Sequence, residues 1–217
     1  MEQGSYKKYL SIGFIVLFST LLINTILSVI PFGYDSTIWK ISGWWYVLSC
    51  VIQIAIVIYL CFYPPCKPSV VSKVGGCLYV LLLLISLVNQ ISFNLTGYSL
   101  IYSSSGIFDC LKALFLYTPG LLLFYWGSKL WLPVKILMTV NVVIDLARIM
   151  ILWTQIVPMY KNIKEYSIKQ IELLQNGYNI IGCIPFFLVL ASLILTIVWY
   201  NKKTMVQIYN NQTLETI

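Results

Sequence analysis

The sequence predicts an all-α protein, a polytopic membrane bundle of about six transmembrane helices joined by short loops. Of its 217 residues, 59% are hydrophobic and only 10% are charged, whereas a soluble domain carries about 25% charged residues. Six apolar stretches reach or approach the length of about 20 residues that a helix needs to cross a bilayer. Two charged residues, Asp145 and Arg148, nevertheless lie deep inside one of these stretches. They indicate a polar interior.

The predicted spans lie near residues 9–31, 41–63, 74–95, 106–127, 136–157 and 178–200. Together they make a single transmembrane domain over residues 1–203, followed by a short polar cytosolic tail at 204–217. The first apolar stretch is too long for the core of a cleaved signal peptide, so we expect it to remain as a signal anchor and first span.

The fourth span is the weakest of the six. Asp109 and Lys112 shorten its uncharged part, and Pro119 with Gly120 should kink it near the middle. A bundle tolerates such a kink when neighbouring helices satisfy the freed backbone groups. A re-entrant hairpin is the main alternative for this segment.

Residues 158–177 form a charged stretch before the sixth span. Pro158 at its start and Gly177 at its end are typical of helix boundaries, and apolar residues are interspersed between them. This pattern predicts one short amphipathic helix lying on the outer membrane surface. The alternative is that the sixth span simply extends into water over the same residues.

The distribution of lysines predicts the orientation. If the N-terminus is cytosolic, eight lysines lie on the inner side, at positions 7, 8, 67, 73, 129, 135, 202 and 203, and four lie on the outer side, at 40, 161, 164 and 169. This excess follows the positive-inside rule, so we expect both termini to be cytosolic. The sequence does not identify the membrane.

Six cysteines are scattered through the apolar stretches. Cys50 and Cys77 are best explained as small packing residues. Cys61 and Cys66 lie near one membrane face, where S-acylation is an alternative to packing.

The fifth span carries a polar face. Asn141, Asp145, Arg148 and Gln155 fall within an arc of about 80° on a helix. A charge at membrane depth is costly unless it is paired or hydrated. These side chains should therefore face protein or a water-filled cavity.

Other spans carry polar residues at a similar depth. Gln53 shares a helical face with Ser42, Tyr46 and Ser49, and further polar residues occur at Asn24, Asn89, Gln90, Asp109 and Lys112. In the orientation above, nearly all of them lie in the outer half of the membrane, with Asn141 as the exception. We therefore predict a hydrated cavity open to the outside, lined by spans one to five, with Asp145 and Arg148 at its floor. The sixth span should face lipid or seal the bundle.

These residues are the candidates for a ligand or ion pathway: Asn141, Asp145, Arg148, Gln53, Asn89, Gln90, Asp109 and Lys112. Arg148 would offer a positive group to an anionic substrate, and Asp145 would hold it in place or relay a cation. The pattern favours a small transport-type or ligand-binding membrane protein, or an accessory subunit of a larger complex. One alternative is a non-transporting organiser whose polar groups serve helix association only, and a second is a lipid-active membrane enzyme.

Several chemistries are disfavoured by what the sequence lacks. It contains no histidine, which removes the usual Ser-His-Asp and Cys-His catalysis, and its cysteines lack metal-ligand spacing. It also has no glycine-rich phosphate-binding loop. We therefore expect no enzymatic activity and no cofactor or metal. The expected partners are the lipid bilayer and another membrane protein or a second copy of the chain, but not nucleic acid, because the lysines are spread over short loops.

Overall fold

The computed structural model describes residues 3–29, 37–66, 68–97, 107–161 and 168–214, and all secondary structure in these ranges is helical. The elements are α1 (Gln3–Val29), α2 (Thr37–Phe62), η1 (Pro64–Cys66), α3 (Val70–Thr96), α4 (Ile107–Lys112), η2 (Ala113–Tyr117), α5 (Thr118–Gly127), α6 (Leu132–Ile151), η3 (Leu152–Ile156), α7 (Val157–Lys161) and α8 (Ile168–Leu214). Six of the helical segments are long and apolar enough to cross a membrane. The all-helical, six-span fold class is confirmed.

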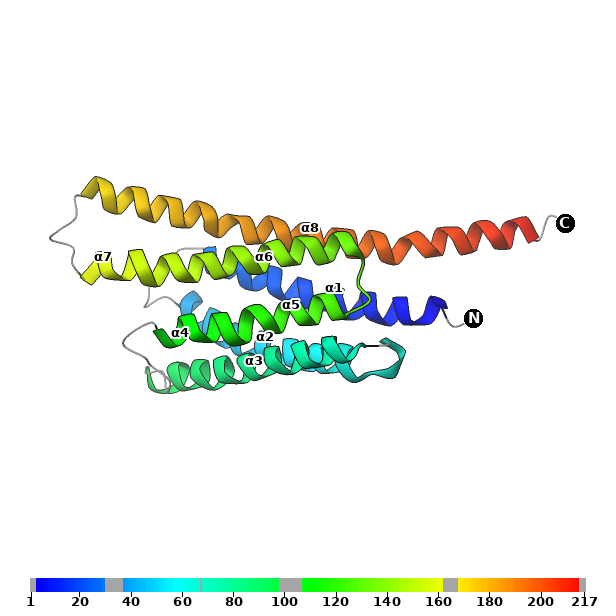
Figure 1. Ribbon diagram of the computed structural model, residues 1–217, viewed down its shortest axis with the longest axis horizontal. Helices are drawn as coiled ribbons and strands as arrows, with labels where there is room; N and C mark the ends of the chain where they lie inside the picture. The colour runs from blue at the N-terminus through cyan, green and yellow to red at the C-terminus, as the bar shows by residue number, and fades with distance from the viewer. Residues whose placement is uncertain (1–2, 30–36, 67, 98–106, 162–167, 215–217) are drawn as a thin grey trace.

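The six spans are arranged as a closed ring. Each packs against two neighbours in the order α1, α2, α3, α5, α6, α8 and back to α1. The first and last helices of the chain are therefore adjacent. Both termini lie at the same end of the bundle, and α8 continues well beyond the other helices there (Figure 1).

Helix α8 is longer than the predicted sixth span. It begins at Ile168 and runs without interruption through Gly177 to Leu214, so the described part of the charged stretch is an extension of the span and not a separate surface helix. A glycine within a helix costs only about 1 kcal/mol relative to alanine, which is too little to end a long helix by itself. The start of the predicted amphipathic helix, residues 162–167, lies outside the described residues.

The fourth span is continuous and does not form a hairpin. α4, η2 and α5 follow one another directly from Ile107 to Gly127. Because proline lacks an N–H and clashes with the carbonyl four residues earlier, it disrupts an α-helix. Here the turn before Pro119 is a π-helical turn, in which the N–H of Thr118 donates to the carbonyl of Ala113. The wider turn accommodates the proline within the helix.

The same device recurs before Pro158. The π-helical turn η3 ends at Ile156, and the N–H of Val157 donates to the carbonyl of Leu152. Each π-helical turn therefore ends two residues before a proline. In the fifth span, α7 follows η3 directly, so the helix continues past Pro158 without a break. Single π-turns inside α-helices are rare and are frequent at functional sites.

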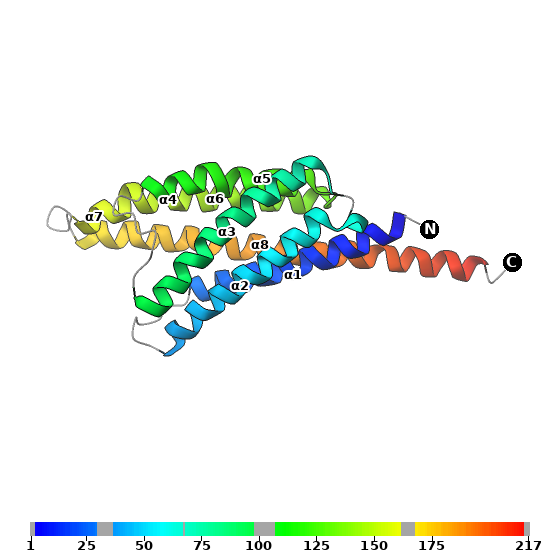
Figure 2. The same cartoon turned by 90° about the horizontal axis from the view of Figure 1, so that it is seen from below.

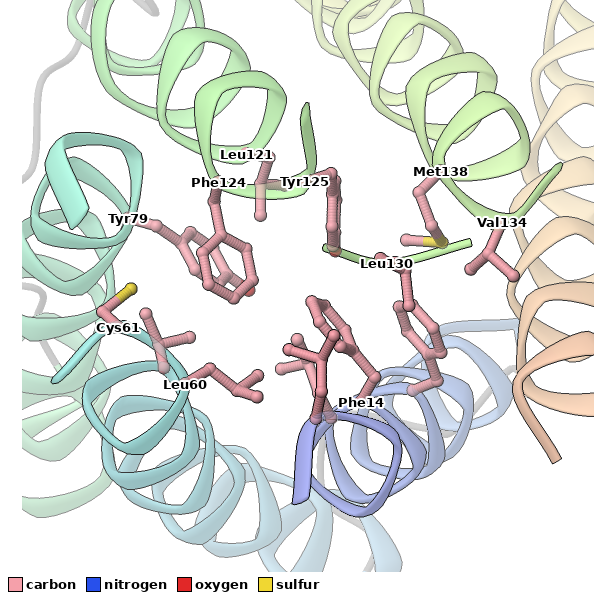
Figure 3. Close-up of a cluster of buried hydrophobic side chains, with 14 of the residues drawn as sticks. Phe14, Leu60, Cys61, Tyr79, Leu121, Phe124, Tyr125, Leu130, Val134 and Met138 are labelled. Carbon is pink, nitrogen blue, oxygen red and sulfur yellow. The ribbon is translucent and has the colours of Figure 1, made fainter. Parts of the chain in front are cut away.

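The half of the ring nearest the termini is filled by a core of aromatic and aliphatic side chains. Phe14 of α1 lies 5.6 Å from Phe124 and 6.2 Å from Tyr125 of α5, measured between ring centroids. Side chains from α1, α2, α3, α5 and α6 point toward this common centre in Figure 3. This end of the bundle is closed by packing.

The backbones of helices α3 and α5 lie in close contact. A Cβ atom on Gly75 would overlap the backbone nitrogen of Phe124, and one on Gly127 would overlap the backbone nitrogen of Ser72. Glycine at these positions lets the two backbones meet, as is common between transmembrane helices. The hydroxyl of Ser72 also donates to the carbonyl of Phe124 at 3.3 Å.

Candidate functional site

A central cavity of about 660 Å³ occupies the half of the ring opposite the termini. All six spans contribute to its wall: Asn24 from α1, Ser42 from α2, Gln90 from α3, Tyr117 and Tyr125 from the fourth span, Asn141, Asp145 and Arg148 from α6, and Pro185 and Val189 from α8. In Figure 2, α1, α2 and α3 diverge from α5, α6 and α8 toward this end of the bundle. The cavity lies in the space between these two groups.

The cavity is deep. On α6 its lining runs from Met138 to Arg148, which corresponds to about 15 Å at 1.5 Å per residue. Tyr125 lines its inner end, and the ring of Tyr125 packs against the aromatic core. At the other end, the lining reaches Leu27 and Ser42, close to the adjoining ends of α1 and α2.

Asp145 is held by two hydrogen bonds to the same carboxylate oxygen. The hydroxyl of Tyr117 donates to Asp145 Oδ2 at 2.7 Å, and the amide of Asn141, one turn earlier on α6, donates to it at 3.2 Å. The carboxylate is thus fixed between two spans. Its second oxygen, Oδ1, lies 3.8 Å from Arg148 Nη1.

Arg148 is positioned more loosely than Asp145. Its guanidinium carbon lies 5.3 Å from the ring centroid of Tyr178 on α8, which is within the range of a cation–π interaction. Gly182, also on α8, leaves room for the guanidinium, because a Cβ atom there would lie 3.1 Å from Arg148 Nη2. Helix α8 therefore shapes the arginine site.

Three buried polar atoms on the cavity wall have no hydrogen-bond partner among the described residues: Arg148 Nε, Asn141 Oδ1 and Tyr125 Oη. The first is a donor, the second an acceptor, and a hydroxyl can act as either. A buried polar atom left unpaired costs about 1–3 kcal/mol. Each of these atoms is buried although its residue lines the cavity.

Asn24 belongs to a network that joins α1 to α2. Its amide donates to Ser49 Oγ at 3.0 Å, and its carbonyl oxygen accepts from Trp45 Nε1, also at 3.0 Å. Trp45 lines the cavity beside it. This network fixes an aromatic side chain in the wall.

A smaller side cavity of about 370 Å³ adjoins the central one. Three of its lining residues also line the central cavity: Tyr46, Gln90 and Phe93. The other three line only the side cavity: Ser86, Asn89 and Lys112. The two cavities are therefore separated by a shared wall of side chains from α2 and α3.

The structure places the predicted site residues in three environments. Asn141, Asp145, Arg148 and Gln90 line the central cavity, and Asn89 and Lys112 line the side cavity with Gln90. Gln53 instead lies within the packed part of the bundle, 2% exposed, where Gln53 Oε1 accepts from the hydroxyl of Tyr79 at 2.6 Å. The side chain of Asp109 lies outside the described residues.

Two expectations about the shape of the cavity need correction. Asp145 and Arg148 lie on the wall and not at the floor, which is formed by residues such as Tyr125 and Met138 deeper in the ring. The sixth span also lines the cavity, through Pro185 and Val189. The reason is that α8 closes the ring between α1 and α6, so one of its faces must point inward.

Three tyrosines in the site were not predicted: Tyr117, Tyr125 and Tyr178. Each contacts or faces a residue on another helix, and spacing along one helix gives no signal for such contacts. Pro119, which marks the π-helical turn next to Tyr117, is the only local feature that could have drawn attention to this part of the fourth span.

Fold and site together define a polytopic helical membrane protein whose ring of six spans encloses a polar cavity. Comparison with protein-family models, with curated proteins and with solved structures finds no match.

Proposed function

We propose that this chain is a small ligand-binding or transport-type membrane protein whose central cavity receives a small polar solute. One observation carries the proposal: a cavity of about 660 Å³ is lined by Asn141 and by the partly exposed charged side chains of Asp145 and Arg148. Pockets for small molecules typically measure about 300–1,000 Å³ and combine apolar walls with a few placed polar groups. The central cavity has both properties.

The lysine distribution supports an orientation with both termini cytosolic. The cavity lies in the half of the ring opposite the termini, so in this orientation it faces outward. Closure of the other half by the aromatic core favours binding from one side. Transport would require that core to open.

The alternative function is that of a membrane organiser, in which polar side chains serve helix association only. The hydrogen bond from Tyr117 to Asp145 favours it, because it joins two spans directly. It does not account for a cavity of about 660 Å³ that Asp145 and Arg148 line with partly exposed side chains. We assign no chemical reaction to the site.

A double variant separates the two functions. Asp145→Asn combined with Arg148→Gln removes both charges and preserves the approximate shapes of the side chains. If the cavity binds a solute, the variant should express and elute like the wild type but lose the thermal stabilisation that a screen of small polar solutes gives the wild type. If the residues serve assembly only, aggregation or loss of the folded fraction should come first, and no solute should stabilise the wild type.

A matched control is available on the same helix. Lys135 and Thr139 of α6 both contact Trp126 and do not line the central cavity. The combined variant Lys135→Gln and Thr139→Val should therefore retain the response of the wild type to solutes.

A further inference from the structure

Asp145 and Arg148 form an ion pair with no net charge, and each of the two charged groups can still bind a ligand group of opposite charge. The distance of 3.8 Å between Arg148 Nη1 and Asp145 Oδ1 exceeds the usual 2.7–3.2 Å of an N–H···O hydrogen bond. Their side chains are similarly exposed, at 23% for Arg148 and 22% for Asp145. A ligand can therefore approach both charges at once.

The close spacing of the two charges disfavours a ligand of single charge. An anion bound to Arg148 would lie beside the carboxylate of Asp145, and a cation bound to Asp145 would lie beside the guanidinium of Arg148. In either case the repulsion between like charges, strengthened by the low dielectric of the bundle, offsets part of the attraction. A ligand that carries both charges avoids this conflict.

The chemistry of the two partly exposed side chains also matches a zwitterion. An ammonium group has three donors and no acceptor, which suits the carboxylate of Asp145, 22% exposed. A carboxylate only accepts, which suits the guanidinium of Arg148, 23% exposed. Asn141 lines the cavity one turn before Asp145.

The ligand's two charges must be close together. Asn141, Asp145 and Arg148 lie on one face of α6 within two turns, and the carboxylate and guanidinium of the protein nearly touch. In an α-amino acid, the ammonium and the carboxylate are attached to the same carbon. The two charges of the ligand and those of Asp145 and Arg148 can therefore alternate in sign around one small site. A zwitterion whose charges are separated by a long chain cannot do this.

The rest of the cavity suits an apolar side chain. Aromatic rings of Trp45, Tyr46 and Phe93 form part of the wall opposite α6, and the volume of about 660 Å³ leaves space beyond the charged groups. Apolar and aromatic walls stabilise a bulky apolar group by removing it from water.

We infer that the central cavity binds a compact zwitterion of the α-amino acid type with a bulky apolar side chain, its carboxylate at Arg148 and its ammonium at Asp145 and Asn141. This inference rests on the proposed function and adds the class of ligand.

Three probes of nearly equal size test the inference: phenylalanine, which carries both charges; 3-phenylpropionate, which lacks the ammonium; and 2-phenylethylammonium, which lacks the carboxylate. Affinity for the purified wild-type protein is measured by calorimetry. Phenylalanine should bind about ten- to a hundredfold more tightly than either analogue, because each analogue forms only one of the two charge pairs and places its charge beside a like charge of the protein. Equal or tighter binding of one analogue would overturn the inference and identify an anion or a cation as the ligand class.

Single variants test the placement of the two charges. Arg148→Gln should shift the preference toward 2-phenylethylammonium, and Asp145→Asn should shift it toward 3-phenylpropionate. Unchanged ranking in a folded variant would contradict the placement. If a variant does not fold, the comparison of the three probes on the wild type still decides the question.

A separate measurement distinguishes failure of this inference from failure of the proposed function. A cysteine introduced at Asp145, whose side chain is 22% exposed in the cavity wall, reports whether the cavity is hydrated, through its reaction with a membrane-impermeant thiol reagent. If it reacts and none of the three probes binds, the zwitterion inference is wrong and the proposed solute-binding cavity stands. If it does not react, both are wrong.

Discussion

The hydroxyl of Tyr117 donates a 2.7 Å hydrogen bond to the carboxylate of Asp145, and through it the fourth and fifth spans are joined beside the central cavity. Tyr117 is the last residue of the π-helical turn η2. The local widening of the helix that accommodates Pro119 therefore lies next to the residue that positions the carboxylate.

Replacing Tyr117 with phenylalanine should destabilise the protein by about 1.5–3 kcal/mol, the typical contribution of a hydrogen bond to a charged group. Tyr125→Phe is the matched control, because it removes a hydroxyl of the same kind that has no partner among the described residues. Because this change also removes the cost of burying an unpaired hydroxyl, it should leave the stability unchanged or raise it. Thermal unfolding in detergent measures both, and equal destabilisation would contradict the assigned partners.

The contact between α3 and α5 depends on glycine at position 75. Gly75→Ala should destabilise the bundle by about 1–3 kcal/mol, the usual cost of overpacking, because the added methyl group would overlap the backbone of Phe124. Gly177→Ala provides the control, since nothing lies within 4 Å of a Cβ atom there. Alanine is the better helix former, so this second change should be neutral or slightly stabilising. The Gly75→Ala variant should therefore melt at a lower temperature than the Gly177→Ala variant. The reverse order would contradict the close contact at Gly75.

The thiols of Cys61 and Cys66 should react slowly in the folded protein. Both are buried, and Cys61 Sγ donates to the carbonyl of Ser72 at 3.4 Å. Such burial argues against S-acylation at either position. Alkylation at neutral pH followed by mass spectrometry should find both thiols modified far more slowly in the folded than in the unfolded protein.

The reactivity of Cys66, which lies between the second and third spans, should also depend on pH. Burial raises the pKa of the Cys66 thiol, and a hydrogen bond with Tyr59 offsets part of the rise. Because the thiolate is the reactive form, a raised pKa means less thiolate at any given pH. The rate of alkylation should therefore reach half of its maximum at a pH above about 8.5, where an ordinary cysteine reaches it. A plateau at the ordinary pH would show that Cys66 is not buried as described.

The spacing of polar residues along the helices was sufficient to predict much of the site. Asn141, Asp145 and Arg148 share one face of α6 and line one cavity, as their positions at i, i+4 and i+7 suggest. Gln53 shows the limit of this argument. It lies on the same face of α2 as Tyr46, but it is seven residues further along the helix and therefore about 10 Å deeper in the bundle. At that depth the ring is filled by side chains, and Gln53 accepts a hydrogen bond from Tyr79.

Contacts between helices could not be predicted in this way. The order of the spans around the ring decides that α8 supplies Tyr178 and Gly182 to the arginine site, and no pattern within α8 indicates that order. The continuation of α8 through Gly177 was one of two open alternatives. Boundary residues alone could not decide it, because the cost of one glycine is small compared with the hydrogen bonds of an uninterrupted helix.

The central claim is that α6 faces a hydrated cavity on one side and lipid on the other, and cysteine accessibility tests it most directly. Single cysteines replace Asp145 and Arg148, which line the cavity with side chains 22% and 23% exposed, or Val140 and Val143, which are 42% and 53% exposed on the outside of the bundle. The background is a variant in which the exposed or half-exposed cysteines at positions 77, 110 and 183 are alanine. A membrane-impermeant thiol reagent added from the side opposite the termini should label positions 145 and 148 and leave 140 and 143 unlabelled. Equal labelling of all four positions, or labelling of the valine positions alone, would contradict the account.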